Sequence, residues 1–251
     1  MVTKKKYELT NETIEFNGVT LHRIKALKDF SDIEDGDLGG WIEKEDNLSQ
    51  IGNAWVYSNA KVYGNAEVHG DAKVYSNAKV FGHAIINNNA EVCGNAIVSD
   101  NAIVSDNVRV FGNALVYGDA HVYGSAEAFG NAQVYDNAKV FDNAQVYGSA
   151  IVSDNARVYG NAKVFETAWV CGNAMVCGDA RVRCGADYII FKNFWSSGRF
   201  FTWTRSNNMW KVGCFYGTGE ELIKKAYKDS EMLSREYERV VRYVNSIFAD
   251  E

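Results

Sequence analysis

Residues 54 to 68 read Ala-Trp-Val-Tyr-Ser-Asn-Ala-Lys-Val-Tyr-Gly-Asn-Ala-Glu-Val, and this pattern continues through half of the chain. An alanine recurs every six residues, with an aliphatic residue two positions later, as far as Ala180 and Val182. The 22 hexads keep one register; Val108 replaces a single alanine and Ala128 a single aliphatic residue. A short period sustained over this length is typical of stacked repeat architectures.

Each hexad predicts a short strand followed by a corner. Alternation of period two buries the alanine and the aliphatic residue and turns their neighbours outward. Corner pairs such as Gly64-Asn65 and Asp136-Asn137 tolerate left-handed or tightly turned backbone. A hexad is too short for a hairpin, so we expect three hexads to close a triangular coil. The 22 hexads then give about seven coils, in a rod roughly 35 Å long.

The hexads resemble the hexapeptide-repeat, left-handed parallel β-helix family, and the handedness follows from this resemblance alone. Residues 20 to 58, with Gly39-Gly40-Trp41-Ile42 and Asn53-Ala54-Trp55, are similar to the opening segment of enterobacterial YdcK-type hexapeptide-repeat proteins. The acetyltransferase label of that family is itself an inference from fold, and a shared fold is not an active site.

Positions taken every 18 residues define three outward faces, named here by their first member. The Tyr57 face, the Tyr63 face and the His69 face each carry a column of mostly aromatic residues, which we expect to stack and stabilise the coils. The columns are Tyr57, Tyr75, Cys93, Phe111, Phe129, Tyr147 and Phe165; Tyr63, Phe81, Ser99, Tyr117, Tyr135 and Ser153; and His69, Asn87, Ser105, Tyr123, Phe141 and Tyr159.

Two faces also carry apolar stripes at their other outward position. The Tyr63 face has Ile97, Leu115, Ile151 and Trp169, and the His69 face has Ile85, Ile103 and Met175. Continuous exposed apolar surface predicts self-association. Proteins of the family that the repeat resembles are commonly trimers with parallel axes, so we expect a homotrimer.

The segments on either side of the hexads predict a three-part chain that is mainly β. Residues 1 to 52 form an N-terminal β cap with a hairpin turn at Asn17-Gly18, and residues 53 to 186 form the β-helix. Residues 187 to 251 form an α+β module, with antiparallel strands over 188–194, 200–205 and 209–215 and two helices after them. Thr218 and Glu221 predict a capping box at the first helix.

The module suggests both a source and a ligand. Its Gly213-Cys214-Phe215 run, followed by Gly217-Thr218 and a helix, resembles the endings of phage-encoded repeat proteins. Aromatic and basic side chains alternate here, a pattern suited to stacking on bases and pairing with phosphates. The candidate ligand-binding residues are Trp195, Arg199, Trp203, Arg205, Trp210 and Lys211. The alternative is that half of these aromatic residues form the core of the module beneath its helices.

The first alternative is that the protein is an enzyme. Hexapeptide acyltransferases use a histidine base between subunits and coenzyme A along the rod, which would make His69 and His121 the catalytic candidates here. These two residues share a face but lie 52 positions apart, about three coils or roughly 14 Å, so they do not form a dyad. The repeat also lacks the loop that shapes the substrate cleft in such enzymes.

The composition indicates which partners, cofactors and location are expected. The formal charge of −6 and the mixed charges along the columns do not favour DNA as a partner. The five cysteines, Cys93, Cys171, Cys177, Cys184 and Cys214, show no zinc spacing, and neither a metal nor a cofactor is expected. No apolar run predicts a signal peptide or a membrane span, so we expect a cytoplasmic protein, in the host cytoplasm if the source is viral.

The sequence therefore favours a non-catalytic, trimeric binding or scaffold protein. Its expected partner is a host nucleotide signal or a host defence protein, bound by the C-terminal module. An acetyl-CoA-dependent acyltransferase and a purely structural rod are the alternatives.

Overall fold

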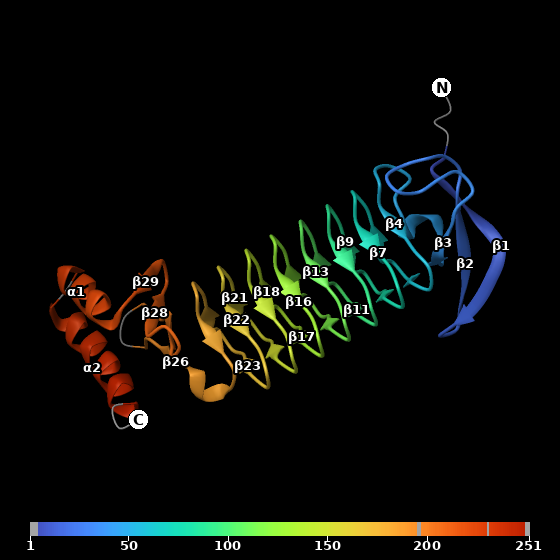
Figure 1. Ribbon diagram of the computed structural model, residues 1–251. Coiled ribbons are helices and arrows are strands. Elements are labelled where there is room, and N and C mark those ends of the chain that lie inside the picture. Colours follow the sequence, from blue (N-terminus) through green and yellow to red (C-terminus); the bar gives the residue numbers. More distant parts are fainter. Residues whose placement is uncertain (1–4, 195–196, 230, 249–251) are drawn as a thin grey trace.

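The computed structural model describes residues 5–194, 197–229 and 231–248, and shows a straight rod closed by different structures at its two ends (Figure 1). The rod contains strands β4 (Trp55–Val56) to β25 (Arg181–Val182), each of two residues and recurring every six residues along the chain. Every alanine and aliphatic residue of the hexads is buried, and together they form one continuous core. The hexad interpretation of the sequence is confirmed.

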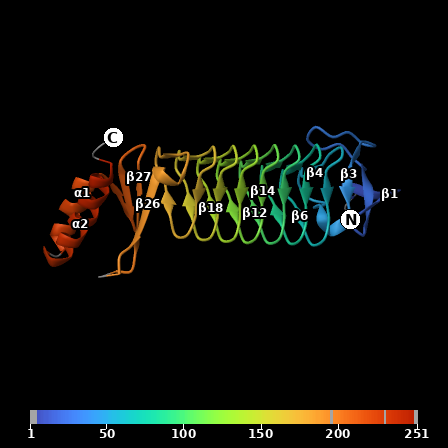
Figure 2. The same ribbon diagram turned by 90° about the horizontal axis from the view of Figure 1, so that it is seen from below.

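The strands stack into three parallel sheets that run along the rod (Figure 2). The Tyr57 face is an eight-stranded sheet, the His69 face is a seven-stranded sheet, and the Tyr63 face belongs to a ten-stranded sheet that also includes the N-terminal hairpin. Strands on one face follow one another every third hexad, as the closed three-hexad coil requires. The β-solenoid has about eight turns, one more than the sequence predicts.

The additional coil comes from the segment before the hexads. Strand β3 (Leu38–Ile42) pairs in parallel with β5 (Lys61–Val62), and Leu48 forms a bridge to Val68. Ile42 pairs with Val62, twenty residues later, whereas Val56 pairs with Val74, eighteen residues later. The first coil is thus two residues longer than the others, which places it outside a strict six-residue count.

The corners use the expected backbone. Their first residue has positive φ, for example +72° at Gly112 and +60° at Asp100. Side chains then join successive coils: the Asp100 carboxylate accepts the Gly118 N–H at 3.1 Å, and Asn95 donates to Asn113 at 3.1 Å. Amide and carboxylate ladders therefore reinforce the stack at its corners.

Most neighbouring rings of the aromatic columns stack as predicted, whereas Tyr57 and Tyr75 meet edge-on. Phe111 and Phe129 have ring centroids 4.8 Å apart with an interplanar angle of 3°, and Phe141 and Tyr159 lie 4.7 Å apart at the same angle. The ring spacing matches the distance between stacked strands. These half-buried side chains stabilise the rod.

The N-terminal end is closed by an antiparallel hairpin of β1 (Tyr7–Phe16) and β2 (Val19–Ala26). Its turn residues, Asn17 and Gly18, have φ of 51° and 79°, as the Asn-Gly signature predicts. A 3₁₀ turn (η1, Glu45–Asn47) follows β3.

Hydrogen-bond donors cover the carbonyl groups of this end. In each inner coil, N–H groups donate to carbonyls of the following coil, such as Trp55 to Ala72 at 3.0 Å. Carbonyls of the first coil have no preceding coil, so other donors reach them. The Lys6 ammonium donates to Ala54 O at 2.8 Å, and the Tyr7 hydroxyl donates to Leu48 O at 2.7 Å.

Because Lys6 is buried, we expect the free energy of unfolding to depend on pH. Burial, reinforced by the nearby Lys28 charge, lowers the pKa of Lys6 to about 8, against 10.5 ordinarily. Between these values the unfolded chain binds more protons than the folded chain, so the free energy of unfolding rises with pH. Denaturant unfolding of Lys6→Met should lack this rise between pH 8 and 10.5. Parallel pH curves for the wild type and the variant would contradict the assignment.

The C-terminal module places a small antiparallel sheet against the rod and two helices beyond it (Figure 1). A 3₁₀ turn (η2, Gly185–Asp187) leads into the module. Its elements are β26 (Tyr188–Lys192), β27 (Phe200–Thr204), β28 (Met209–Val212), β29 (Phe215–Gly217), α1 (Gly219–Asp229) and α2 (Glu231–Ile247). The sheet has four strands rather than the predicted three, because Gly213, with φ of 56°, turns the chain within the expected third strand.

The helices of the module follow the sequence prediction. Thr218 N–H donates to the Glu221 carboxylate at 2.8 Å, and Glu221 N–H donates back to the Thr218 hydroxyl at 3.3 Å. This is the predicted capping box. Val241 and Val244 are buried in the module core, so the apolar stripe of α2 packs on the sheet.

Side-chain acceptors cover the N–H groups of the last coil. The Thr202 hydroxyl accepts from Met175 N–H at 2.9 Å, and the Ser206 hydroxyl accepts from Arg181 N–H at 2.7 Å. The Asp187 carboxylate accepts from Arg183 N–H at 2.7 Å. The module thus completes the hydrogen bonds that a further coil would make, and donors at one end of the rod mirror acceptors at the other.

Candidate functional site

The two histidine candidates lie on the same face, three strands apart, as their spacing predicts. His121 belongs to β15 (His121–Val122), between Ile103 and Lys139 in register. Burial, followed by the Lys139 charge, lowers the pKa of His121, so its imidazole is neutral at pH 7. The His69 Nε2 atom is buried and makes no hydrogen bond within the described structure.

The six ligand-binding candidates of the module fall into different surroundings. Trp195 lies outside the described residues. Trp210 is fully buried and Trp203 is 4% exposed, so neither ring has a face free to stack on a base in this structure. Trp203 packs on Phe248 with 4.9 Å between ring centroids. The interpretation of these aromatic residues as core beneath the helices describes them better.

The basic candidates point to three places. Arg199 lines a small cavity of about 110 Å³ beside Cys214 and Phe215. The Lys211 ammonium lies 5.9 Å from the centre of the Tyr159 ring, on the rod. The Arg205 guanidinium lies 4.8 Å from the centre of the Phe248 ring. The assignment of these side chains to one ligand site stays a prediction.

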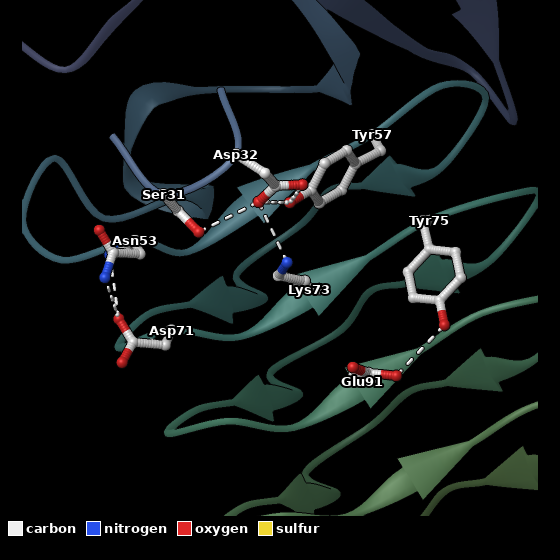
Figure 3. A network of polar contacts seen from close by, with 8 residues as sticks. All are labelled: Ser31, Asp32, Asn53, Tyr57, Asp71, Lys73, Tyr75 and Glu91. Atoms are coloured by element: carbon white, nitrogen blue, oxygen red, sulfur yellow. Dashed lines mark hydrogen bonds and ion pairs between the residues drawn. The ribbon is translucent and has the colours of Figure 1, made fainter. Parts of the chain in front are cut away.

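A polar network that the sequence did not predict joins the N-terminal cap to the Tyr57 face (Figure 3). Asp32, in the loop between β2 and β3, accepts hydrogen bonds from the Tyr57 hydroxyl and the Lys73 ammonium, each at 3.1 Å. Ser31 also donates to this carboxylate at 3.1 Å. On the next coil, the Tyr75 hydroxyl donates to Glu91 at 3.2 Å.

The electrostatics of this network are those of a stable contact. Burial raises the pKa of Asp32, but hydrogen bonds from Lys73, Ser31 and Tyr57 outweigh this effect and hold the pKa below its ordinary value. The hydrogen bond to Asp32 raises the pKa of Lys73, and burial raises the pKa of Tyr57 to about 12. At neutral pH these three groups therefore keep one charge state and fasten the cap loop to the rod.

A groove of about 390 Å³ lies along this network. Its lining residues are Asp32, Tyr57, Ser58, Lys73, Tyr75, Ser76 and Glu91. Hydroxyl and carboxylate groups on two adjacent coils can hydrogen-bond a small polar ligand. The 18-residue spacing in the sequence predicts that Lys73 and Glu91 are neighbours. The position of Asp32 was not predictable, because it depends on how the cap loop folds back.

The described residues offer neither a clustered metal site nor a membrane-spanning helix. These residues contain no group of three or more His, Cys, Asp and Glu side chains placed to hold a metal ion. No helix among them combines the length and the apolar character needed to cross a membrane.

Comparison with known proteins bears on the rod. Residues 90–106, 108–124 and 132–148 match the family model described as the YdcK beta solenoid repeat. A protein of Escherichia coli K12 named "Uncharacterized acetyltransferase YdcK" is 39% identical over 61 residues, which cover 21% of this chain and 19% of that protein. The alignment thus spans about a fifth of the relative's length. The rod of this chain is a β-solenoid of stacked coils, and its matched repeats are similar to the YdcK beta solenoid repeat.

Proposed function

We propose that this chain is a non-catalytic binding scaffold in which three rods assemble side by side. The observation that carries the proposal is the apolar stripe on the Tyr63 face. Ile97 and Leu115 are adjacent in register, as are Ile151 and Trp169, and Gln133 is the one polar residue between the two pairs. The Trp169 side chain is 53% exposed. Burial of such a stripe against another copy would remove apolar surface from water.

The second stripe supplies the complementary surface. Ile85 and Ile103 lie in register on the His69 face, and Met175 lies further along it. A closed ring of three rods can place one face of each copy against a different face of the next. Three C-terminal modules would then stand at one end of the assembly, which multiplies their avidity for a multivalent partner.

The proposal also includes a binding partner and a location in the cell. Arginine and lysine side chains of the module support a nucleotide signal or a host defence protein as the bound partner, in the cytoplasm of a host cell if the chain comes from a phage. Capture of neither nucleotides nor host proteins by the immobilised protein would contradict this part of the proposal.

Leu115→Glu is expected to convert the trimer into a monomer. The substitution places a carboxylate in the middle of the apolar stripe, and burying that charge without a partner costs more than the stripe contributes. Lys163→Glu is the matched control, because it puts the same carboxylate on the Tyr57 face beside Gln145 and Arg181. Sedimentation velocity should give a monomer for the first variant and a trimer for the second. Equal masses for the two variants would contradict an interface on the Tyr63 face.

An acetyl-CoA-dependent acyltransferase is the second candidate function. The name of the Escherichia coli relative favours it, and so does the neutral imidazole of His121, since a general base must be unprotonated at working pH. Release of free coenzyme A from acetyl-CoA, lost in His121→Ala or His69→Ala, would support this function in place of the scaffold.

A further inference from the structure

A cleft opens where the last coil of the rod meets the C-terminal module. It has a volume of about 620 Å³ and lies at the end of the Tyr57 face. Its lining residues are Phe165, Arg181, Arg183, Asp187, Arg205 and Ser206. Three of these six side chains are guanidinium groups, in a chain with a formal charge of −6. The cleft is therefore a local concentration of positive charge on an acidic protein.

One column of outward residues on the Tyr57 face leads to the cleft, and the charges of its side chains change along the rod. In its middle, acids flank Arg109 on both sides: its Nε lies 3.7 Å from Glu91, and its Nη1 lies 3.5 Å from Glu127. At its end the column finishes with Lys163 and Arg181, paired in register, and no acid follows them in the column. The stacking that neutralises Arg109 is thus missing at Arg181.

Two described acids of the chain act on the rod side of the cleft. The Asp187 carboxylate, whose side chain is 4% exposed, accepts both the backbone N–H and the Nε–H of Arg183. Asp187, and at longer range Glu166, raise the pKa of Arg183. On the rod side of the cleft, within the described residues, these two carboxylates face the guanidinium groups of Arg181 and Arg183 and the ammonium of Lys163, so positive charge is in excess there.

Aromatic rings restrain two of the arginines. The Arg181 guanidinium lies 5.6 Å from the centre of the Phe165 ring, at the end of a stacked aromatic column, and the Arg205 guanidinium lies over Phe248. Side chains that are already held in place lose less conformational entropy when they bind a ligand. Guanidinium groups present paired N–H donors that match the oxygens of a phosphate group.

From these observations we infer that the junction cleft binds a phosphate-bearing small molecule with at least two negative charges. Arg181 and Arg183 come from the rod and Arg205 from the module, so the ligand bridges the two parts of the chain. The volume of the cleft falls in the range of small-molecule sites, about 300–1,000 Å³. This inference deepens the proposed binding role by naming a site and a ligand class, and it does not depend on trimer formation.

Isothermal titration calorimetry of the full chain at low ionic strength tests the site. Inorganic tripolyphosphate and ATP should both bind, whereas adenosine should not. Tighter binding of ATP would indicate a nucleotide ligand, and equal binding would indicate recognition of the phosphate chain alone. Absence of binding by both phosphorylated compounds, or binding of adenosine alone, would overturn the inference.

Two arginine variants make the test specific. Arg181→Gln should weaken tripolyphosphate binding by about tenfold, the loss of one charge-assisted contact. Arg109→Gln removes an arginine from the same column but between two glutamates, and should change the affinity by no more than about twofold. Equal losses in the two variants would show a non-specific charge effect and would overturn the site. The mass in solution, measured separately, reports on the trimer proposal whatever the outcome here.

Discussion

Replacement of Trp55 by alanine is expected to lower the free energy of unfolding by about 3–5 kcal/mol. Trp55 occupies the position that faces outward in every later hexad, yet it is 1% exposed. The cap covers it: Phe30 and Tyr7 meet its ring edge-on, with centroids 5.3 and 6.1 Å away. The substitution leaves a cavity between the cap and the first coils, and Tyr7 also caps Leu48 O.

Trp169→Ala provides the matched control. Trp169 holds the same hexad position but is 53% exposed, so its loss should change the stability of the monomer by less than about 1 kcal/mol. Urea unfolding at low protein concentration, where association is weak, gives both values. Similar losses for the two tryptophans would contradict the role of Trp55 as the residue that joins the cap to the rod.

Gly112→Val is expected to destabilise the rod by roughly 2–5 kcal/mol. Gly112 has φ of +72°, a conformation that a β-branched residue strongly disfavours. An added Cβ would also lie 3.0 Å from Gly130 N and 3.1 Å from Gly130 O. Both atoms belong to the next coil, which cannot move away without breaking the parallel ladder.

Gly112→Asn separates the two causes of this loss. Asn88 and Asp100 occupy the same corner position with φ of 56° and 60°, so this backbone accepts a short polar side chain. Asp100 even adds a hydrogen bond to the N–H of Gly118 on the next coil. Thermal unfolding should therefore show a much smaller loss for Gly112→Asn than for Gly112→Val. An equal loss would mean that the corner requires glycine for space alone.

The rod was predictable because one six-residue rule repeats without interruption. Burial of the alanine and the aliphatic residue, positive φ at the corners and stacking of the aromatic columns all follow from that rule. The first coil was not predictable in this way. Its β3 strand has Gly39 and Gly40 in place of the hexad pattern, because an added Cβ at Gly39 would lie 2.5 Å from Ile24 Cγ1 and one at Gly40 would lie 2.7 Å from Val56 Cγ1.

The two ends of the rod were harder to predict. The hairpin turn at Asn17-Gly18 and the capping box at Thr218 depend on local contacts, and both were found from the sequence. The contacts of Thr202 with Met175 and of Lys6 with Ala54 join residues 27 and 48 positions apart. Such pairings depend on how the end structures dock on the rod, which no periodic pattern encodes.

The candidate sites, too, depend on docking contacts that the sequence pattern does not encode. Alternation along β27 allowed either face of the strand to be buried, and only the docking of α2 decides that Phe201 and Trp203 face the helices. Arg181 and Arg183 belong to the last coil, where they read as ordinary outward residues of a hexad. They become candidate phosphate ligands only because the module places Arg205 beside the same cleft.

Native mass spectrometry of the unmodified 251-residue chain shows directly whether three rods assemble side by side. If the proposed trimer forms, the dominant species has three times the chain mass of 27.9 kDa. A dominant species of 27.9 kDa at micromolar concentration would contradict it, and the apolar stripe of the Tyr63 face would then need another occupant.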